Sequence, residues 1–130
     1  MAAPPIELIL MHQLAGHLAM PIFVVDPEGT LLFYNEPAEA VLGVRYNETG
    51  TMPAEQWATM FQPMDQHGKP IEPEGLPLMI ATLKRQPAHR DFWIRGLDGE
   101  LRQIEVTAIP LVAQAGRFLG AVAIFWETPA

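Results

Sequence analysis

The chain has 130 residues, 49% of them hydrophobic and 18% charged, so it is long enough for one folded domain and too apolar for a disordered segment. Eight basic residues against fifteen acidic ones give a net charge of −7, which disfavours nucleic acid as a partner because phosphate binding needs a basic surface. The sequence contains neither cysteine nor serine, which excludes disulfides, thiolate metal ligands and nucleophilic catalysis by either residue.

The first segment, Ile6 to Met20, is predicted to be an amphipathic helix because leucine and methionine recur at spacings of three and four residues, and Pro21 ends it. This segment lacks the basic start and unbroken apolar stretch of a signal peptide. No apolar run in the chain reaches the roughly 18 residues of a membrane span. We therefore expect a cytoplasmic protein whose opening helix is covered by another surface.

A hairpin and a short helix are predicted next. Ile22 to Val25 and Leu31 to Tyr34 are apolar runs of β-forming residues, and Asp26-Pro27-Glu28-Gly29 between them has the composition of a type I turn. Asn35 is suited to cap the helix that follows, because its side-chain oxygen can accept from a free backbone N–H, and Gly43 ends that helix.

Two or three further helices are predicted in the middle of the chain. Glycine, proline, asparagine and aspartate interrupt the sequence from Val44 to Pro73, where we expect one or two short helices, the clearest from Pro53 to Phe61. Leu76 to Gln86 has a stronger helical pattern, with a proline near its start and two basic residues at its end, where they complement the helix dipole.

The last third of the chain is predicted to be a meander of three antiparallel strands, His89 to Arg95, Glu100 to Leu111 and Arg117 to Glu127. The middle strand alternates between apolar and polar residues, whereas the final strand is apolar on both faces and must be covered on both. Together these elements predict an α+β fold, with one antiparallel sheet that carries helices on one face and the opening helix on the other.

The order of these elements and the residues at their junctions resemble the PAS domain. The family's first hairpin and helix are similar to PIFVVDPEGTLLFYNEPAEAVLG, residues Pro21 to Gly43. The linker of many bacterial members resembles FQPMDQHGKPIEPEGLPLMIATLKR, residues Phe61 to Arg85, and the closing strands match IRGLDGELRQIEVTAIPL and GRFLGAVAIFWET. The resemblance covers about Pro21 to Thr128, so we divide the chain into an N-terminal helix over residues 1–20 and a PAS domain over residues 21–128.

This resemblance implies a five-stranded sheet curved around a pocket that the helices close. It also implies a sensory module, not an enzyme, that acts in signal transduction through a fused or separate kinase, cyclase or regulator, as in bacterial two-component systems. A cavity for a small apolar ligand and a filled core cannot be distinguished from the side chains alone. Strand alternation within this fold predicts that the pocket is lined by Phe23, Val25, Met79, Leu83, Phe92, Ile94, Ile104, Val106, Ala108, Val122 and Ile124.

Neither haem nor a cysteinyl flavin is expected as a cofactor. The blue-light members of the family form a flavin adduct through a cysteine and place amides where this sequence has Ile94, Ile104 and Val122. One large class of haem members takes its axial histidine from the long helix, and Leu76 to Gln86 contains none. The four histidines are not spaced to converge on a metal, and no catalytic residues are predicted.

A homodimer is predicted because the opening helix is apolar on more than one side, and a two-fold axis would cover both sides at once. The predicted interface comprises Leu8, Leu10, Met11, Leu14, Leu18, Leu119 and Phe125.

Two alternative functions remain open. One is a PAS module with a filled core that acts only in dimerisation or protein–protein interaction. The other is a small cone-shaped isomerase or dehydratase, which requires an inward-facing Asp or His that the apolar inward positions do not supply.

Overall fold

The computed structural model describes residues 20–128, which fold around one sheet of five antiparallel strands. The strand order is β2-β1-β5-β4-β3, so the last strand of the chain lies in the centre of the sheet. The strands are β1 (Ile22–Val25), β2 (Leu31–Tyr34), β3 (Ala88–Arg95), β4 (Leu101–Val112) and β5 (Phe118–Glu127). All five were predicted from the sequence, and the antiparallel sheet is confirmed.

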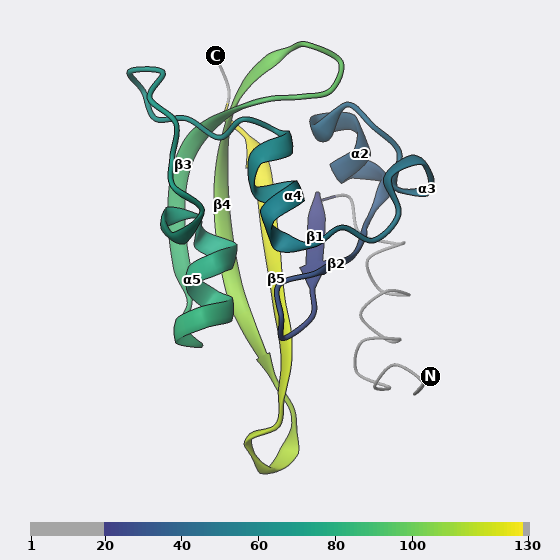
Figure 1. Ribbon diagram of the computed structural model, residues 1–130, viewed down its shortest axis with the longest axis vertical. Helices are drawn as coiled ribbons and strands as arrows, with labels where there is room; N and C mark the ends of the chain where they lie inside the picture. The colour runs from purple at the N-terminus through teal and green to yellow at the C-terminus, as the bar shows by residue number, and fades with distance from the viewer. Residues whose placement is uncertain (1–19, 129–130) are drawn as a thin grey trace.

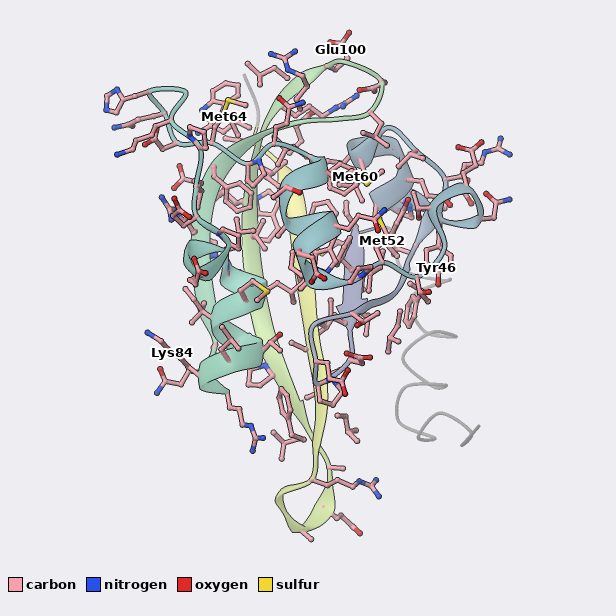
Figure 2. The ribbon with its side chains drawn as sticks, viewed as in Figure 1. Tyr46, Met52, Met60, Met64, Lys84 and Glu100 are labelled. Atoms are coloured by element: carbon pink, nitrogen blue, oxygen red, sulfur yellow. The ribbon has the colours of Figure 1, made fainter. Side chains whose placement is uncertain are left out.

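The helices pack against one face of this sheet, with α4 (Ala54–Met60) and α5 (Pro77–Lys84) in front of the strands in Figure 1. The helices α2 (Glu36–Leu42), α4 and α5 were predicted, and α3 (Tyr46–Thr49) lies where the sequence left open a second short helix. The 3₁₀ turns were not predicted. Figure 2 shows Met52 and Met60 pointing into the space between α4 and the α2–α3 segment, while Lys84 and Glu100 point outward. The helices are α2 (Glu36–Leu42), α3 (Tyr46–Thr49), α4 (Ala54–Met60) and α5 (Pro77–Lys84), with 3₁₀ turns η1 (Pro73–Gly75) and η2 (Gln114–Gly116).

Asn35 joins three elements at their ends, which explains why the chain turns from β2 into α2 at this residue. Its Oδ1 accepts from the backbone N–H of Ala38 at 3.2 Å, as the predicted helix cap does, and also from that of Ile22 at 2.9 Å. Its Nδ2 donates to the carbonyl oxygen of Met20 at 2.8 Å. The start of β1 is therefore held to the end of β2 through one buried side chain.

The two faces of the sheet bury separate apolar clusters. The face under the helices contains Phe23, Val106, Ala123 and Phe125, among others. The opposite face contains Ile22, Val24, Phe33 and Val122, with Ile124 packed against them. Both faces bury apolar residues, as the apolar final strand predicted.

The side of β5 that faces the helices was predicted wrongly. Leu119 and Phe125 were expected on the outer face and Val122 and Ile124 on the inner one, but Phe125 belongs to the cluster under the helices and Val122 to the opposite cluster. The reason is that a strand with apolar residues on both sides carries no pattern that distinguishes them. The pairing of Ala123 with Phe23 and Ala108, both correctly predicted as inward, determines the sides instead.

The predicted opening helix, apart from Met20, lies outside the described residues, so the helix, its packing and its five predicted interface residues stay predictions. Within residues 20–128, no helix is long and apolar enough to cross a membrane.

A hydrogen-bonded clamp joins the end of α2 to the turn between β3 and β4. The backbone N–H of Leu97 donates to the carbonyl oxygen of Leu42 at 2.9 Å. In the same turn, Asp98 accepts two hydrogen bonds from the Arg102 guanidinium, at 2.7 and 3.1 Å, and one from the backbone N–H of Glu100 at 3.0 Å. These hydrogen bonds stabilise the charged carboxylate, and those from Arg102 contribute most. They lower the pKa of the Asp98 carboxyl from 3.8 to about 2.

We predict that Asp98 makes the protein less stable in acid. Because the folded-state pKa lies below the unfolded one, the unfolded state binds more protons between these values, so stability is lost as the pH falls from about 4 to about 2. Asp98→Asn should flatten this part of the stability profile, and Arg102→Gln should do so too because it removes the main cause of the shift. The loss of stability is measured as the shift of the urea unfolding midpoint between pH 5 and pH 2. If wild type and Asp98→Asn lose stability equally as the pH falls, the prediction is contradicted.

Gly120 is required where β5 passes the end of β1. Its φ is +130°, and a Cβ there would lie 2.1 Å from the carbonyl oxygen of Val25, which is backbone and has no room to move. We expect Gly120→Ala to destabilise the fold by more than the roughly 1–2 kcal/mol of an unfavourable backbone conformation alone. Gly116→Ala is the matched control, since its φ is +72° but a Cβ would meet nothing within 4 Å. Chemical denaturation compares the two, and equal losses would show that the contact with Val25 is unimportant.

Candidate functional site

Between the inner face of the sheet and the helices lies a small apolar cavity of about 80 Å³, which is open to solvent on one side. Its walls come from β1, β3, β4 and β5 on one side and from α2, α4, α5 and the segments that flank them on the other. Every residue of this lining is apolar. They are Phe23, Leu42, Trp57, Ala58, Phe61, Pro63, Leu76, Pro77, Leu78, Phe92, Ile94, Ile104, Val106, Ala123 and Phe125.

An aromatic group holds one wall of the cavity in place. The indole N–H of Trp57 on α4 donates to the carbonyl oxygen of Gly29 at 2.8 Å, which ties α4 to the turn between β1 and β2. The Trp57 ring meets the Phe23 ring edge-on, with centroids 5.4 Å apart, and the Phe23 ring stacks on Tyr34 at 5.8 Å. These contacts are geometries that aromatic rings favour, and they fix the orientation of Trp57 and Phe23 beside the cavity.

Burial beneath the helices affects the ionisation of the neighbouring tyrosines. Loss of solvation raises the pKa of Tyr34, whose hydroxyl donates to the carbonyl oxygen of Val44 at 3.1 Å. The pKa of Tyr46 is raised by burial as well, and its hydroxyl donates to the carbonyl oxygen of Leu32. Both phenols therefore remain neutral at physiological pH and act as structural donors that secure the α2–α3 segment.

The predicted pocket residues divide into three groups. Phe23, Phe92, Ile94, Ile104 and Val106 line the cavity together, from the three strands β1, β3 and β4. Others belong to the same core without lining the cavity: Val25 and Ala108 are buried in it, and Met79 packs against it. The remaining three lie elsewhere: Leu83 is 63% exposed on α5, and Val122 and Ile124 are on the opposite face of the sheet.

The helical side of the lining was largely missed from the sequence. Trp57, Ala58 and Phe61 lie on and just after α4 at spacings of one and four residues, so they share one helix face, and that spacing could have identified them. Ala123 and Phe125 were missed because β5 was assigned the wrong inner face. The two predicted interface residues within the described chain, Leu119 and Phe125, are buried at 6% and 3% exposure and cannot form a surface.

A second hollow, of about 260 Å³, has the opposite chemistry. It lies beside β3 and is lined by charged and polar side chains, including Asp65, His67, Arg90 and Asp91. The two backbone N–H groups that bind Asp65, from Lys69 and His67, lower the pKa of its carboxyl and close a local turn. Across residues 20–128, no three histidine, aspartate or glutamate side chains converge as metal ligands would. We therefore take the apolar cavity as the candidate ligand site.

The comparison with known proteins agrees with this architecture. The sequence matches the family model of the PAS fold over residues 10–126, and no curated protein sequence matches the chain. A PAS domain from Colwellia psychrerythraea is similar in structure, with a TM-score of 0.67, 17% identity and coverage of 94% of this chain and 97% of that one.

Two other solved structures show the same fold in proteins of named function. The PAS domain of a two-component sensor histidine kinase has a TM-score of 0.62 at 12% identity, covering 95% of this chain and 97% of its own. The fungal blue-light photoreceptor Vivid, solved as a light-state dimer, has a TM-score of 0.62 at 13% identity, covering 84% and 78%. The family match over nearly the whole chain, on a five-stranded antiparallel sheet that wraps an apolar cavity under helices, establishes that the chain belongs to the PAS family of sensory and signalling domains.

Proposed function

We propose that this PAS domain senses a small, uncharged, apolar molecule that binds in the cavity under α4. The observation that carries the proposal is the lining, which consists wholly of apolar side chains. Such a cavity favours a molecule without hydrogen-bonding groups, because a polar group inside would lose its bonds to water and find no partner. The same lining offers no acid or base for the isomerase or dehydratase alternative.

The size of the cavity narrows the ligand class. An apolar cavity of about 150 Å³ stays dry and binds benzene or xenon, whereas this cavity has about 80 Å³. The part of the ligand that this space holds is therefore no larger than a single unsubstituted ring, and an aromatic ring needs small movements of the side chains around it. Rings from Phe23, Trp57, Phe61, Phe92 and Phe125 surround the space, which suits an aromatic hydrocarbon.

Haem and a cysteinyl flavin are not part of this proposal. The cavity lining contains neither histidine nor an amide side chain, and the sequence contains no cysteine.

The output is proposed to pass to a kinase, cyclase or regulator, fused or separate. Support comes from the similar PAS domain of the two-component sensor histidine kinase, although that similarity concerns the fold.

Benzene is the probe that tests the ligand proposal. We expect it to shift the NMR signals of the lining residues, with protein as purified showing no visible absorption band of haem or flavin. Ala123→Leu should lower benzene affinity by about tenfold or more, which corresponds to about 1.4 kcal/mol, because the larger side chain fills the cavity. Val122→Leu is the control, since Val122 lies on the opposite face and should leave binding unchanged.

A folded Ala123→Leu variant that binds benzene as tightly as wild type would refute the proposed site, as would a wild type that binds none. Ala58→Leu fills the cavity from α4 and replaces Ala123→Leu if that variant does not fold. A filled core that serves only in protein interactions predicts no benzene binding by any of these variants.

We also propose that two copies of the chain pair through the outer face of the sheet. Ile109 lies opposite Val122 on that face and is 39% exposed, at the margin of the buried outer cluster. An exposed apolar side chain next to a buried apolar cluster is suited to an interface between copies. The similar photoreceptor Vivid was solved as a light-state dimer, which supports the pairing of two copies.

Sedimentation of the full chain at tens of micromolar tests the dimer. We expect wild type to sediment as a dimer and Ile109→Glu to sediment as a monomer, because a charge would be buried in the interface. Leu83→Glu is the control, since Leu83 is also apolar and is more exposed than Ile109, at 63%, but lies on α5, on the other face of the sheet. A monomeric wild type, or a dimer that tolerates Ile109→Glu, would refute this interface.

A further inference from the structure

The outer edge of β3 is divided into a paired half and an open half. β3 is the last strand of the sheet, with β4 on its inner side. On its outer side, Trp93 exchanges two backbone hydrogen bonds with Met64, each of 2.9 Å, and the N–H of Arg95 donates to the carbonyl oxygen of Phe61 at 2.8 Å. The segment from Phe61 to Met64 therefore covers the half of this edge that ends at Arg95.

The other half of the edge, at His89 and Asp91, is open. Because successive residues of a strand point their N–H and C=O groups to alternate sides, these two residues present theirs on the same side as Trp93, away from β4. Within residues 20–128, no hydrogen bond reaches these four backbone groups, which we call the open edge. Both residues are exposed, and a row of unpaired groups on an edge strand is a template for another strand.

A turn at residues 65–69 directs the chain away from the open edge. The Asp65 carboxylate accepts from the backbone N–H groups of His67 at 2.8 Å and Lys69 at 3.0 Å, so the backbone is bonded within the turn itself. The turn projects beyond β3 in Figure 1. The polar hollow of about 260 Å³ lies between this turn and residues 90–93 of β3. It therefore occupies the place where a further strand segment would continue along the edge.

The charge at the open edge favours a basic partner. The Asp91 carboxylate lines the hollow, and its hydrogen bond from Gln103 Nε2 is long, at 3.5 Å. No basic side chain within residues 20–128 forms an ion pair with Asp91. Residues directly opposite each other on neighbouring strands have their side chains on the same face, so a lysine or arginine opposite Asp91 would pair with its carboxylate. Trp93 also lines the hollow, where its ring can contact such a cation.

A second copy of the chain is a poorer occupant of the open edge. A two-fold axis through Arg90 or Asp91 would set that charged residue directly opposite its own copy, and like charges in opposite positions are destabilising. The net charge of −7 also opposes the pairing of two copies through a polar edge. The open edge therefore suits a separate segment that carries positive charge.

We propose that the open edge of β3 binds an extended peptide segment of a partner protein, with a lysine or arginine of that segment opposite Asp91. The segment runs antiparallel to β3, as the chain does where Met64 pairs with Trp93. Its residues opposite Asp91 and His89 each exchange two backbone hydrogen bonds with β3, and its basic side chain lies in the polar hollow. The interaction uses backbone groups and charge instead of the apolar cavity, so it does not rest on the proposed ligand.

A synthetic pentapeptide, acetyl-Thr-Val-Arg-Val-Thr-amide, tests the proposal in an NMR titration of the full chain. We expect it to bind and to slow hydrogen exchange of the His89 and Asp91 amides by about tenfold or more, because both become hydrogen-bonded. The same peptide with glutamate in place of arginine should bind about fivefold more weakly. A peptide with N-methyl groups on its arginine and its last threonine should lose about tenfold or more in affinity, because it cannot donate to the open edge.

Two variants of Asp91 separate the charge from the backbone pairing. Asp91→Asn should remove the preference for the arginine peptide over the glutamate peptide. Asp91→Pro should abolish binding because it removes a donor of the open edge, while proline is tolerated on an edge strand where the N–H faces solvent. Glu28→Gln is the control and should leave binding unchanged, since Glu28 is an exposed carboxylate in the turn between β1 and β2, next to the opposite edge strand.

A wild type that does not bind the arginine peptide at millimolar concentration would overturn the site. Equal binding of the N-methylated and parent peptides would overturn the strand pairing, and this comparison replaces Asp91→Pro if that variant does not fold. Equal binding of the arginine and glutamate peptides would overturn the role of Asp91. If the His89 and Asp91 amides of the free chain become protected as the protein concentration rises, a second copy occupies the edge and the peptide proposal is overturned.

Discussion

The position of β5 in the centre of the sheet is the constraint on which the cavity depends. Because β5 pairs with β1 on one side and β4 on the other, the residue opposite Ala123 is Phe23 in one neighbour and Ala108 in the other. Both of these neighbours face the helices, so Ala123 and Phe125 must face them too. A shift of one residue in this register would exchange the two apolar faces of β5 and replace the small Ala123 in the cavity wall.

The cavity survives in this core because rigid elements hold its walls apart. Trp57 is fixed by its hydrogen bond to Gly29 and by its ring contact with Phe23, so it cannot collapse inward freely. Alanines at Ala58 and Ala123 leave space that larger side chains would fill. Since well-packed interiors contain few voids, a space bounded by small residues and fixed aromatic rings is a feature that a sensory domain can use.

Polar contacts are placed at the two ends of this apolar structure. Asn35 joins the starts of β1 and α2 to the end of β2, and the Arg102 guanidinium joins the end of α2 to the turn between β3 and β4 and to β5. The helix α2 is thus held at both of its ends by side chains from the sheet or its borders.

Much of this architecture could be predicted from the sequence alone. Local chemistry was sufficient for the strands, for the Asn35 cap and for the turns, because each depends on neighbouring residues. The alternation of β4, with Ile104 and Val106 between polar residues, placed those two side chains under the helices correctly.

Only the tertiary structure decided which face of β5 is internal, because a strand that is apolar on both sides has no local signal and takes its orientation from its neighbours. The same holds for the junction at Arg102. Val41, Asp98 and Glu127 meet one guanidinium although 86 residues of sequence separate the first from the last. Local sequence determined the elements of this protein, and long-range pairing determined its cavity and the contacts around it.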